Sequence, residues 1–131
     1  AMSRADDLLK IRGLLQERRR TTETAQAGAR RELAALKDQE RDPEYEEQAQ
    51  AELADYTLST LIEAQRREIM LIDAALARME NDVFGECVDC GNEISLDRLE
   101  AMPFAIRCEE DAAIHEQETR EAARHVGSLS L

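Results

Sequence analysis

The spacing of apolar residues predicts a long amphipathic helix over residues 3–40. Ser3 is a favourable N-cap, and Asp6 and Asp7 place negative charge in the first turn, where the helix dipole favours it. Apolar or small residues then recur every three or four positions, which places them on one face. They are Leu8, Ile11, Leu15, Thr22, Ala25, Ala29, Leu33 and Leu36. Around Gly28 this face carries only small residues, so we expect a close helix–helix approach there without a thick core.

A second helix is predicted from Glu44 to about Asp82. Asp42-Pro43 precedes it and interrupts the first pattern, because proline disfavours helix at the residue before it. The second helix carries apolar residues on the a and d positions of a seven-residue repeat. They are Leu58, Ile62, Gln65, Ile69, Ile72, Leu76, Met79 and Val83.

Two helices of similar length, joined by an abrupt turn, are typical of an antiparallel hairpin. We therefore predict a mostly α fold with a coiled-coil hairpin over residues 3–83 and a tip near residues 41–47. Each arm of roughly 36 residues would be about 54 Å long at 1.5 Å per residue. The second arm ends next to Cys87 in the sequence, so we expect a small finger-type domain at the open end of the hairpin.

The chemistry of the chain is concentrated between Phe84 and Asp111. Cys87 and Cys90 have C-x-x-C spacing, and seventeen residues separate Cys90 from Cys108. Two thiolates three residues apart can reach one tetrahedral zinc ion at about 2.3 Å. Gly85 and Gly91 flank the pair and supply the backbone freedom that such a turn needs. The pattern predicts a zinc site, although Asp111 stands where a second C-x-x-C would place its last cysteine.

The identity of the fourth ligand is open at this stage. Asp111 can bind zinc at about 2.0–2.2 Å and would complete a site with Cys87, Cys90 and Cys108. His115, one helical turn further along, is a rival. A third alternative is a metal-free finger held by the packing of apolar side chains. These are Phe84, Ile94, Leu96, Leu99, Phe104 and Ile106.

The end of the chain completes the predicted organisation. The finger and a C-terminal helix form a unit over residues 84–125. The helix is expected at residues 112–125, packed against the finger, and residues 126–131 are expected to form a loose tail.

Composition supports this outline and restricts the function. Of the 131 residues, 35% are charged and only 3% are aromatic, which is typical of long helices. The net charge is -12, which argues against a general nucleic-acid binder and against direct sequence-specific DNA binding. Residues 1–40 hold nine Lys or Arg and seven Asp or Glu, whereas the other ninety-one hold eight and twenty-two. The acidic second half favours solubility or a basic protein partner.

Several classes of protein are unlikely on the same grounds. No apolar run approaches the ~20 residues of a membrane span, and we find no signal peptide, so a cytoplasmic location is expected. Three cysteines favour metal binding or free thiols over a disulfide framework. No cleft lined by large apolar residues is predicted, so we do not expect an enzyme, zinc-dependent or otherwise.

The finger resembles a known family. Phe84-Gly85-Glu86-Cys87, Cys90-Gly91, Ile94-Ser95, Arg98 to Ala101, Pro103 and Cys108 together resemble the DksA/TraR family of bacterial RNA polymerase-binding transcription regulators. These motifs cover residues 84–111. With the long hairpin before them, the resemblance extends to about residues 5–120.

The resemblance implies a partner and a mode of action. Members of this family insert a coiled coil into the secondary channel of RNA polymerase, with acidic tip residues near the catalytic centre. Their D-x-x-D-x-A motif corresponds here to Glu44, Glu47 and Ala49, with glutamate in place of each aspartate. The resemblance thus implies a monomeric regulator that modulates initiation through Glu44 and Glu47.

Two further expectations follow at this stage. The family's basic positions for the alarmone ppGpp correspond to Leu71, Met102 and Ala112, which cannot pair with phosphate, so a weak or absent ppGpp response is expected. The alternative function is a structural or interaction module, a coiled coil with a zinc-finger fold and a partner other than polymerase.

Overall fold

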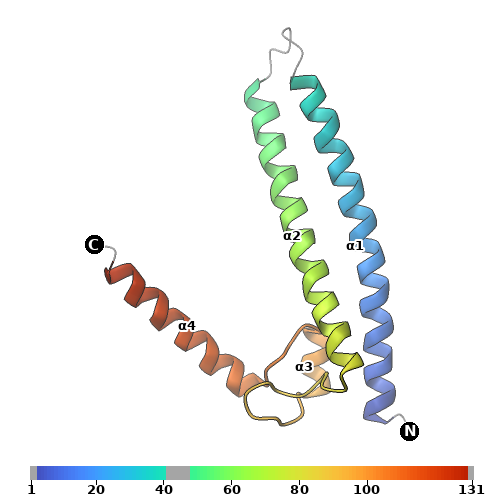
Figure 1. Cartoon of the computed structure of the whole chain (residues 1–131), viewed down its shortest axis with the longest axis vertical. Coiled ribbons are helices and arrows are strands. Elements are labelled where there is room, and N and C mark those ends of the chain that lie inside the picture. Colours follow the sequence, from blue (N-terminus) through green and yellow to red (C-terminus); the bar gives the residue numbers. More distant parts are fainter. Residues whose placement is uncertain (1–2, 41–47, 130–131) are drawn as a thin grey trace. The chain divides into compact units, whose positions relative to one another are not determined.

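The computed structural model of the chain describes residues 3–40 and 48–129 (Figure 1). Its helices are α1 (Arg4–Glu40), α2 (Gln48–Glu80), α3 (Leu96–Ala101) and α4 (Glu109–Leu129). The mostly helical fold class predicted from the sequence is confirmed. The predicted tip, including Glu44 and Glu47, lies outside the described residues, whereas Ala49 is exposed in the first turn of α2. Within the described ranges, no helix is both long enough and apolar enough to cross a bilayer.

The chain divides into two units that do not follow the boundary expected after residue 83. One unit combines Ala1–Arg12 with Ala75–Leu131, and the other is Gly13–Ala74. The first turns of α1 and the end of α2 therefore belong with the finger. One reason is apolar packing, since Leu8 of α1, Met79 of α2 and Phe84 line the same pocket.

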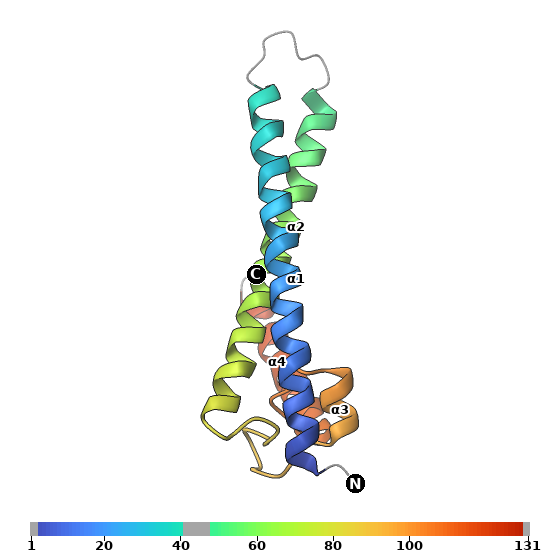
Figure 2. The ribbon, with the colours of Figure 1, turned by 90° about the vertical axis from the view of Figure 1, so that its right-hand side faces the viewer.

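The unit Gly13–Ala74 is an antiparallel helical hairpin, in which α1 and α2 lie side by side (Figures 1 and 2). Within this unit the predicted heptad positions of α2 face α1, since Ile62 and Ile72 are buried and Leu58, Gln65 and Ile69 are half-buried. The last predicted position, Val83, is wrong, because α2 ends at Glu80 and Val83 is 37% exposed. This periodic burial is what apolar residues at a and d positions require. The buried residues of the unit are Leu15, Thr22, Ala29, Ala51, Ile62 and Ile72.

One predicted position of α1 is wrong. Ala25 is exposed, and Gln26 occupies the half-buried position at the helix contact. The Gln26 side chain donates a hydrogen bond from Nε2 to the Ile62 carbonyl across the hairpin, at 3.4 Å. A polar side chain can take this position because its amide finds an acceptor on the facing helix.

The middle of the hairpin contains polar contacts in place of a thick apolar core. Thr22 is 7% exposed and donates from Oγ1 to Glu68 Oε2 at 3.2 Å, and Arg18 pairs with the other oxygen of the same carboxylate. Arg19 donates two hydrogen bonds to Asp73, at 2.6 and 3.2 Å. These bonds lower the pKa of Asp73 and raise that of Arg19. Solvent screens exposed ion pairs such as Arg19–Asp73, so they stabilise the hairpin only weakly.

The other unit has its own small core around the end of α2. Among the described residues, its buried apolar side chains are Ile11, Ala75, Phe84, Cys87, Ile94 and Leu99. Helix α2 ends in a Schellman motif, in which Val83 N donates to Arg78 O at 3.0 Å and Asp82 N to Met79 O at 3.2 Å. Asp82 takes the left-handed conformation that this motif needs, with φ 58°. The turn directs the chain straight into the cysteine segment.

Helix α4 corrects two expectations. It begins at Glu109 and ends at Leu129, so residues 126–129 are helical and not a loose tail. It is not packed along the finger either. Asp111 and Ala112 in its first turn are half-buried, whereas every residue from Ala113 to Gly127 is exposed. Helix α4 accordingly extends away from α3 (Figure 1). The apolar residues of α4 suggested a helix that packs against the finger. Most of them are alanines, which bury little surface.

The hairpin core gives a testable prediction. Ile72 has no exposed surface, so Ile72→Ala leaves a cavity and should lower the free energy of unfolding by about 2–5 kcal/mol. Its neighbour Leu71 is 49% exposed, and Leu71→Ala should cost less than about 0.5 kcal/mol. Urea unfolding followed by circular dichroism measures both. Equal effects of the two substitutions would contradict the assigned face of α2.

Candidate metal centre

The first half of the site is a tight hairpin-like turn, here called the knuckle (residues 85–94). Glu86 and Glu93 form an isolated antiparallel bridge. Around it Ile94 N donates to Gly85 O at 2.7 Å, and Cys87 N donates to Asn92 O at 2.8 Å. These bonds hold the two sides of the knuckle together and place Cys87 and Cys90 on the same turn.

Two glycines make this turn possible. Gly85 has φ 84° and Gly91 has φ 75°, both in the region that residues with a side chain rarely adopt. Gly91 N donates to Cys87 O at 2.9 Å, which closes the turn between Cys87 and Cys90. The expectation that Gly85 and Gly91 provide backbone freedom is confirmed at both positions.

The second half of the site comes from the start of α4. Cys108 precedes the helix, and Ala112 N donates to its carbonyl at 2.8 Å in the first helical turn. Asp111 is therefore one turn on from Cys108 and lies on the same side of the helix. Val88 N donates to Ile106 O at 2.9 Å, which holds the knuckle against the segment leading to α4.

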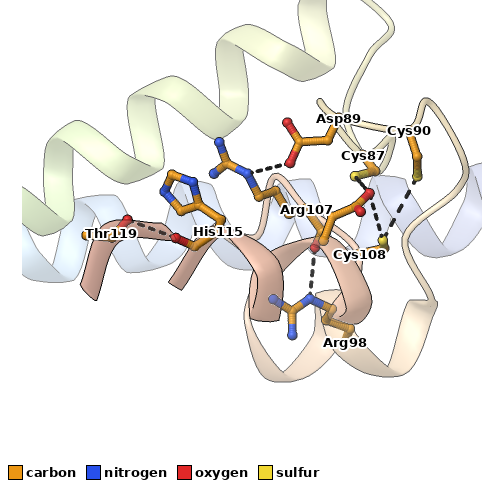
Figure 3. Close-up of polar contacts among 9 residues, drawn as sticks. Cys87, Asp89, Cys90, Arg98, Arg107, Cys108, His115 and Thr119 are labelled. Carbon is orange, nitrogen blue, oxygen red and sulfur yellow. Dashed lines mark hydrogen bonds and ion pairs between the residues drawn. The ribbon is translucent and has the colours of Figure 1, made fainter. Parts of the chain in front are cut away.

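The structure brings Cys87, Cys90, Cys108 and Asp111 together. Figure 3 shows the three cysteines of this cluster. One ligand atom from each residue lies within 4.8 Å of all the others. Asp111 Oδ2 is 3.1 Å from the Cys87 sulfur and 3.3 Å from the Cys108 sulfur, and the sulfurs of Cys90 and Cys108 are 4.0 Å apart. Cys87 is 3% exposed, whereas Cys90 is open to solvent.

His115 does not join this cluster. The group of ligand atoms contains Asp111 and no atom of His115. Figure 3 shows the His115 ring further along α4, away from the three cysteines. His115 is exposed, and its carbonyl accepts a hydrogen bond from Thr119 Oγ1 at 2.9 Å within the helix. Among the two fourth-ligand candidates, the geometry favours Asp111.

The four side chains influence each other's protonation. Hydrogen bonds from the Cys87, Cys90 and Cys108 thiols lower the pKa of Asp111, and Arg107 contributes in the same direction. The Asn92 N–H lowers the pKa of Cys90, but the Asp111 carboxylate, burial and the other thiols outweigh it and raise this pKa to about 12. The cluster therefore favours one carboxylate with protonated thiols beside it.

The remaining two thiols shift in opposite directions. Burial raises the pKa of Cys87, but backbone N–H groups of Cys90 and Cys108 outweigh burial, and the net shift is downward. For Cys108 the Asp111 N–H lowers the pKa, but burial and the Asp111 carboxylate outweigh it, and the net shift is upward. Cys87 is thus the thiol that most readily becomes a thiolate.

The donor set fits a four-coordinate zinc ion. With bonds of about 2.3 Å to sulfur and about 2.0–2.2 Å to oxygen, tetrahedral geometry places sulfurs about 3.8 Å apart and oxygen about 3.6 Å from sulfur. The observed oxygen–sulfur separations of 3.1 and 3.3 Å are somewhat shorter than this, and the sulfur–sulfur separation of 4.0 Å is slightly longer, so small side-chain adjustments would complete a tetrahedral site. Three sulfurs and one carboxylate oxygen are also ligands that zinc accepts.

Residues around the cluster hold it in place, and the sequence analysis assigned none of these bonds, although Ser95 and Arg98 belong to the family motif quoted there. Arg107 Nε donates to Asp89 Oδ2 at 2.9 Å, joining the segment before α4 to the knuckle. Arg98 of α3 donates from Nε to the Arg107 carbonyl at 2.9 Å. Helix α3 is itself capped by Ser95, whose hydroxyl accepts from Arg98 N at 3.2 Å. The motif contains Ser95 and Arg98, but the spacing alone does not show that Arg98 binds the Arg107 carbonyl or that Arg107 binds Asp89.

Comparison with known proteins identifies the same region. Residues 83–117 match the family described as the prokaryotic dksA/traR C4-type zinc finger. The RNA polymerase-binding transcription factor DksA of Caulobacter vibrioides is 43% identical over 56 residues, which are 43% of this chain and 39% of that protein. The Haemophilus influenzae protein of the same name is 43% identical over 44 residues, 34% of this chain and 30% of its own length.

One solved structure extends the likeness beyond the finger. Transcription factor DksA2 from Pseudomonas aeruginosa matches with a TM-score of 0.72 and 29% identity, covering 88% of this chain and 86% of that one. The finger of this chain, residues 83–117, therefore belongs to the dksA/traR zinc-finger family, and the chain as a whole resembles DksA2 in its helical hairpin with a finger. Its sequence matches span less than half the length of the named relatives. The family finger is of the C4 type, and this chain keeps three of the four cysteines.

The raised pKa of Cys90 predicts that this thiol reacts slowly. In protein treated with a chelator, Cys90 is exposed, yet its pKa of about 12 leaves little thiolate at pH 8. Alkylation needs the thiolate, so its rate at Cys90 should rise about tenfold per pH unit between pH 8 and pH 10. Asp111→Asn removes the neighbouring negative charge and should speed the reaction at pH 8. Mass spectrometry of iodoacetamide-treated protein measures both. Reaction of Cys90 at the rate of an ordinary exposed cysteine would contradict the assignment.

Proposed function

We propose that Cys87, Cys90, Cys108 and Asp111 bind one structural zinc ion. The proposal is supported by the clustering of their ligand atoms within 4.8 Å and by the C4-type finger of the family. Zinc would supply a cross-link between the knuckle and the first turn of α4. The chain's own residues prepare it, because hydrogen bonds already hold the two segments together at Val88 and Ile106.

The fourth ligand gives the second prediction for this site. A carboxylate is a harder ligand than a thiolate, so Asp111→Cys should raise zinc affinity roughly tenfold and Asp111→Ala should lower it by a similar factor. His115→Ala is the matched control and should leave affinity unchanged. Competition with a chromophoric zinc chelator measures all three. A loss of affinity in His115→Ala but not in Asp111→Ala would assign the ligand to His115 instead.

We further propose that the chain is a non-enzymatic regulator that binds RNA polymerase through its secondary channel and modulates initiation. The observation that carries this proposal is the occurrence, in one chain, of the family's finger and a hairpin of helices of 37 and 33 residues. At 1.5 Å per residue these helices are about 50–55 Å long, which suits insertion into a deep channel. The names of the relatives, RNA polymerase-binding transcription factors, support the same partner.

Charge is consistent with this partner. The net charge of -12 disfavours binding to a DNA backbone and favours a channel lined by basic groups. Carboxylates at the tip, Glu44 and Glu47, would act near the catalytic magnesium, either on the metal or on mobile elements beside it. A weak ppGpp response remains a prediction. At two of its three positions, Leu71 and Met102, the side chains are apolar and exposed.

The tip hypothesis predicts a separation of binding from regulation. The Glu44→Ala/Glu47→Ala variant should bind core RNA polymerase with unchanged affinity, because the other contacts remain, and should lose its effect on initiation. Co-migration with polymerase measures binding, and the lifetime of open complexes measures regulation.

The control variant removes two carboxylates elsewhere on the hairpin. Glu63→Ala/Glu80→Ala changes the net charge equally and should keep both properties. Normal regulation by the Glu44/Glu47 variant would refute the tip mechanism. Failure of the unsubstituted chain to bind polymerase would instead favour the interaction-module alternative.

A further inference from the structure

Two arginines from the ends of the long helices bind the backbone around the knuckle. Arg4, in the first turn of α1, donates from Nη2 to the Gly85 carbonyl at 3.1 Å and to the Ile94 carbonyl at 2.9 Å. Its Nε also lies 3.5 Å from Glu93 Oε2. Gly85 and Ile94 stand at the two ends of the knuckle, so one guanidinium closes it.

Arg78, in the last turn of α2, also binds two backbone carbonyls. Its Nη2 donates to the Val83 carbonyl at 3.0 Å and to the Glu86 carbonyl at 2.8 Å. The Arg78 carbonyl in turn accepts from Val83 N and Phe84 N, at 3.0 and 3.2 Å. Arg78 therefore holds the segment that enters the knuckle through both its backbone and its side chain.

We propose that Arg4 and Arg78 form an arginine clamp that positions the metal-binding cysteines. Three of the four carbonyls they bind precede Cys87, those of Val83, Gly85 and Glu86, and the fourth, that of Ile94, lies on the opposite side of the knuckle. A planar guanidinium suits this role, because its fixed donors can serve two acceptors at once. The inference rests on the proposed zinc site and assigns positioning residues to it.

The fit around Arg4 is close. A Cβ atom built on Gly85 would lie 3.0 Å from Arg4 Nη2, which is shorter than an ordinary van der Waals contact. Glycine at this position thus serves two purposes, since φ 84° would strain a residue with a side chain, and a Cβ atom would also push the Arg4 guanidinium away from its bonds. The side chain of Arg4 is 26% exposed, so its bonds to the knuckle are partly shielded from water.

The positive charge of Arg4 and Arg78 supports the same role as their hydrogen bonds. Three thiolates and one carboxylate carry four negative charges, of which one zinc ion would neutralise two. The cationic side chains of Arg4 and Arg78 donate to the backbone within one or two residues of Cys87. Their positive charge would oppose the net negative charge of the ionised ligand set, while their hydrogen bonds fix the backbone that carries Cys87.

Coupling of this kind is reciprocal. If the clamp helps the site to bind zinc, zinc must strengthen the contact of Arg4 with the knuckle and so secure the first turn of α1. That turn is otherwise stabilised by Ser3, which accepts from Asp6 N through its hydroxyl and from Asp7 N through its carbonyl, at 3.2 and 3.1 Å. Zinc binding should therefore slow amide hydrogen exchange over residues 7–11.

The test uses the full chain with Arg4→Gln, Arg78→Gln and Arg4→Lys. Each glutamine variant should weaken zinc affinity about tenfold, as loss of a supporting hydrogen bond around a metal site typically does. Arg4→Lys should fall between, since its ammonium can donate to both carbonyls but not in the planar geometry of arginine. Arg124→Gln removes the same charge from exposed α4 and is the matched control.

Two further measurements separate positioning from a merely structural role. The visible absorption of the Co²⁺-loaded protein reports the ligand geometry and should change in the glutamine variants but not in Arg124→Gln. Zinc should slow exchange over residues 7–11 in the unsubstituted chain and have no such effect in Arg4→Gln. Circular dichroism confirms that each variant remains helical.

The outcomes distinguish the clamp from the site. If the unsubstituted chain binds zinc and both glutamine variants bind it within about twofold of that affinity, the clamp is refuted while the site stands. If the unsubstituted chain binds no zinc, the proposed site is refuted and the clamp with it.

Discussion

Three thiols and a carboxylate within 4.8 Å of one another impose the main constraint on this chain, because their ionised forms repel each other. The protonation pattern shows how the groups adapt: thiol hydrogen bonds lower the pKa of Asp111, backbone N–H groups lower that of Cys87, and burial and the Asp111 carboxylate raise those of Cys90 and Cys108. Either protons or a divalent cation must balance the negative charge of these four groups. Zinc binding would therefore release protons, and affinity would depend on pH.

The surrounding structure holds these groups together against that repulsion. Bonds between Val88 and Ile106, between Arg107 and Asp89, and between Arg98 and the Arg107 carbonyl connect the knuckle, α3 and the start of α4. The cluster thus depends on hydrogen bonds more than on apolar burial. The hairpin unit has a similar character, since Thr22, Gln26 and Glu68 make polar bonds along its helix contact. In both units polar bonds supply specificity where large apolar side chains are scarce.

Local patterns in the sequence predicted the parts of the structure that depend on local rules. The heptads of α2 identified Ile62 and Ile72 as buried, and cysteine spacing with two glycines identified the knuckle and the position of Asp111. Interactions between distant residues could not be read in the same way. Arg4 and Ile94 are 90 residues apart, and no pattern links an arginine to backbone carbonyls. The pattern placed Ala25 at the helix contact, whereas Gln26 takes that position in the structure. It can do so because the facing helix supplies the Ile62 carbonyl as an acceptor.

The exposure of α4 has a consequence for its own folding. Starting a helix is the costly step, and each later residue adds little. From Ala113 to Gly127 every side chain faces solvent, so this stretch gains almost nothing from burial. Helix α4 must therefore start at the turn that carries Cys108 and Asp111. The knuckle holds this turn in place. The sulfur cluster thereby acts as a nucleus, and whatever loosens that turn should shorten the whole helix from its first residue onward.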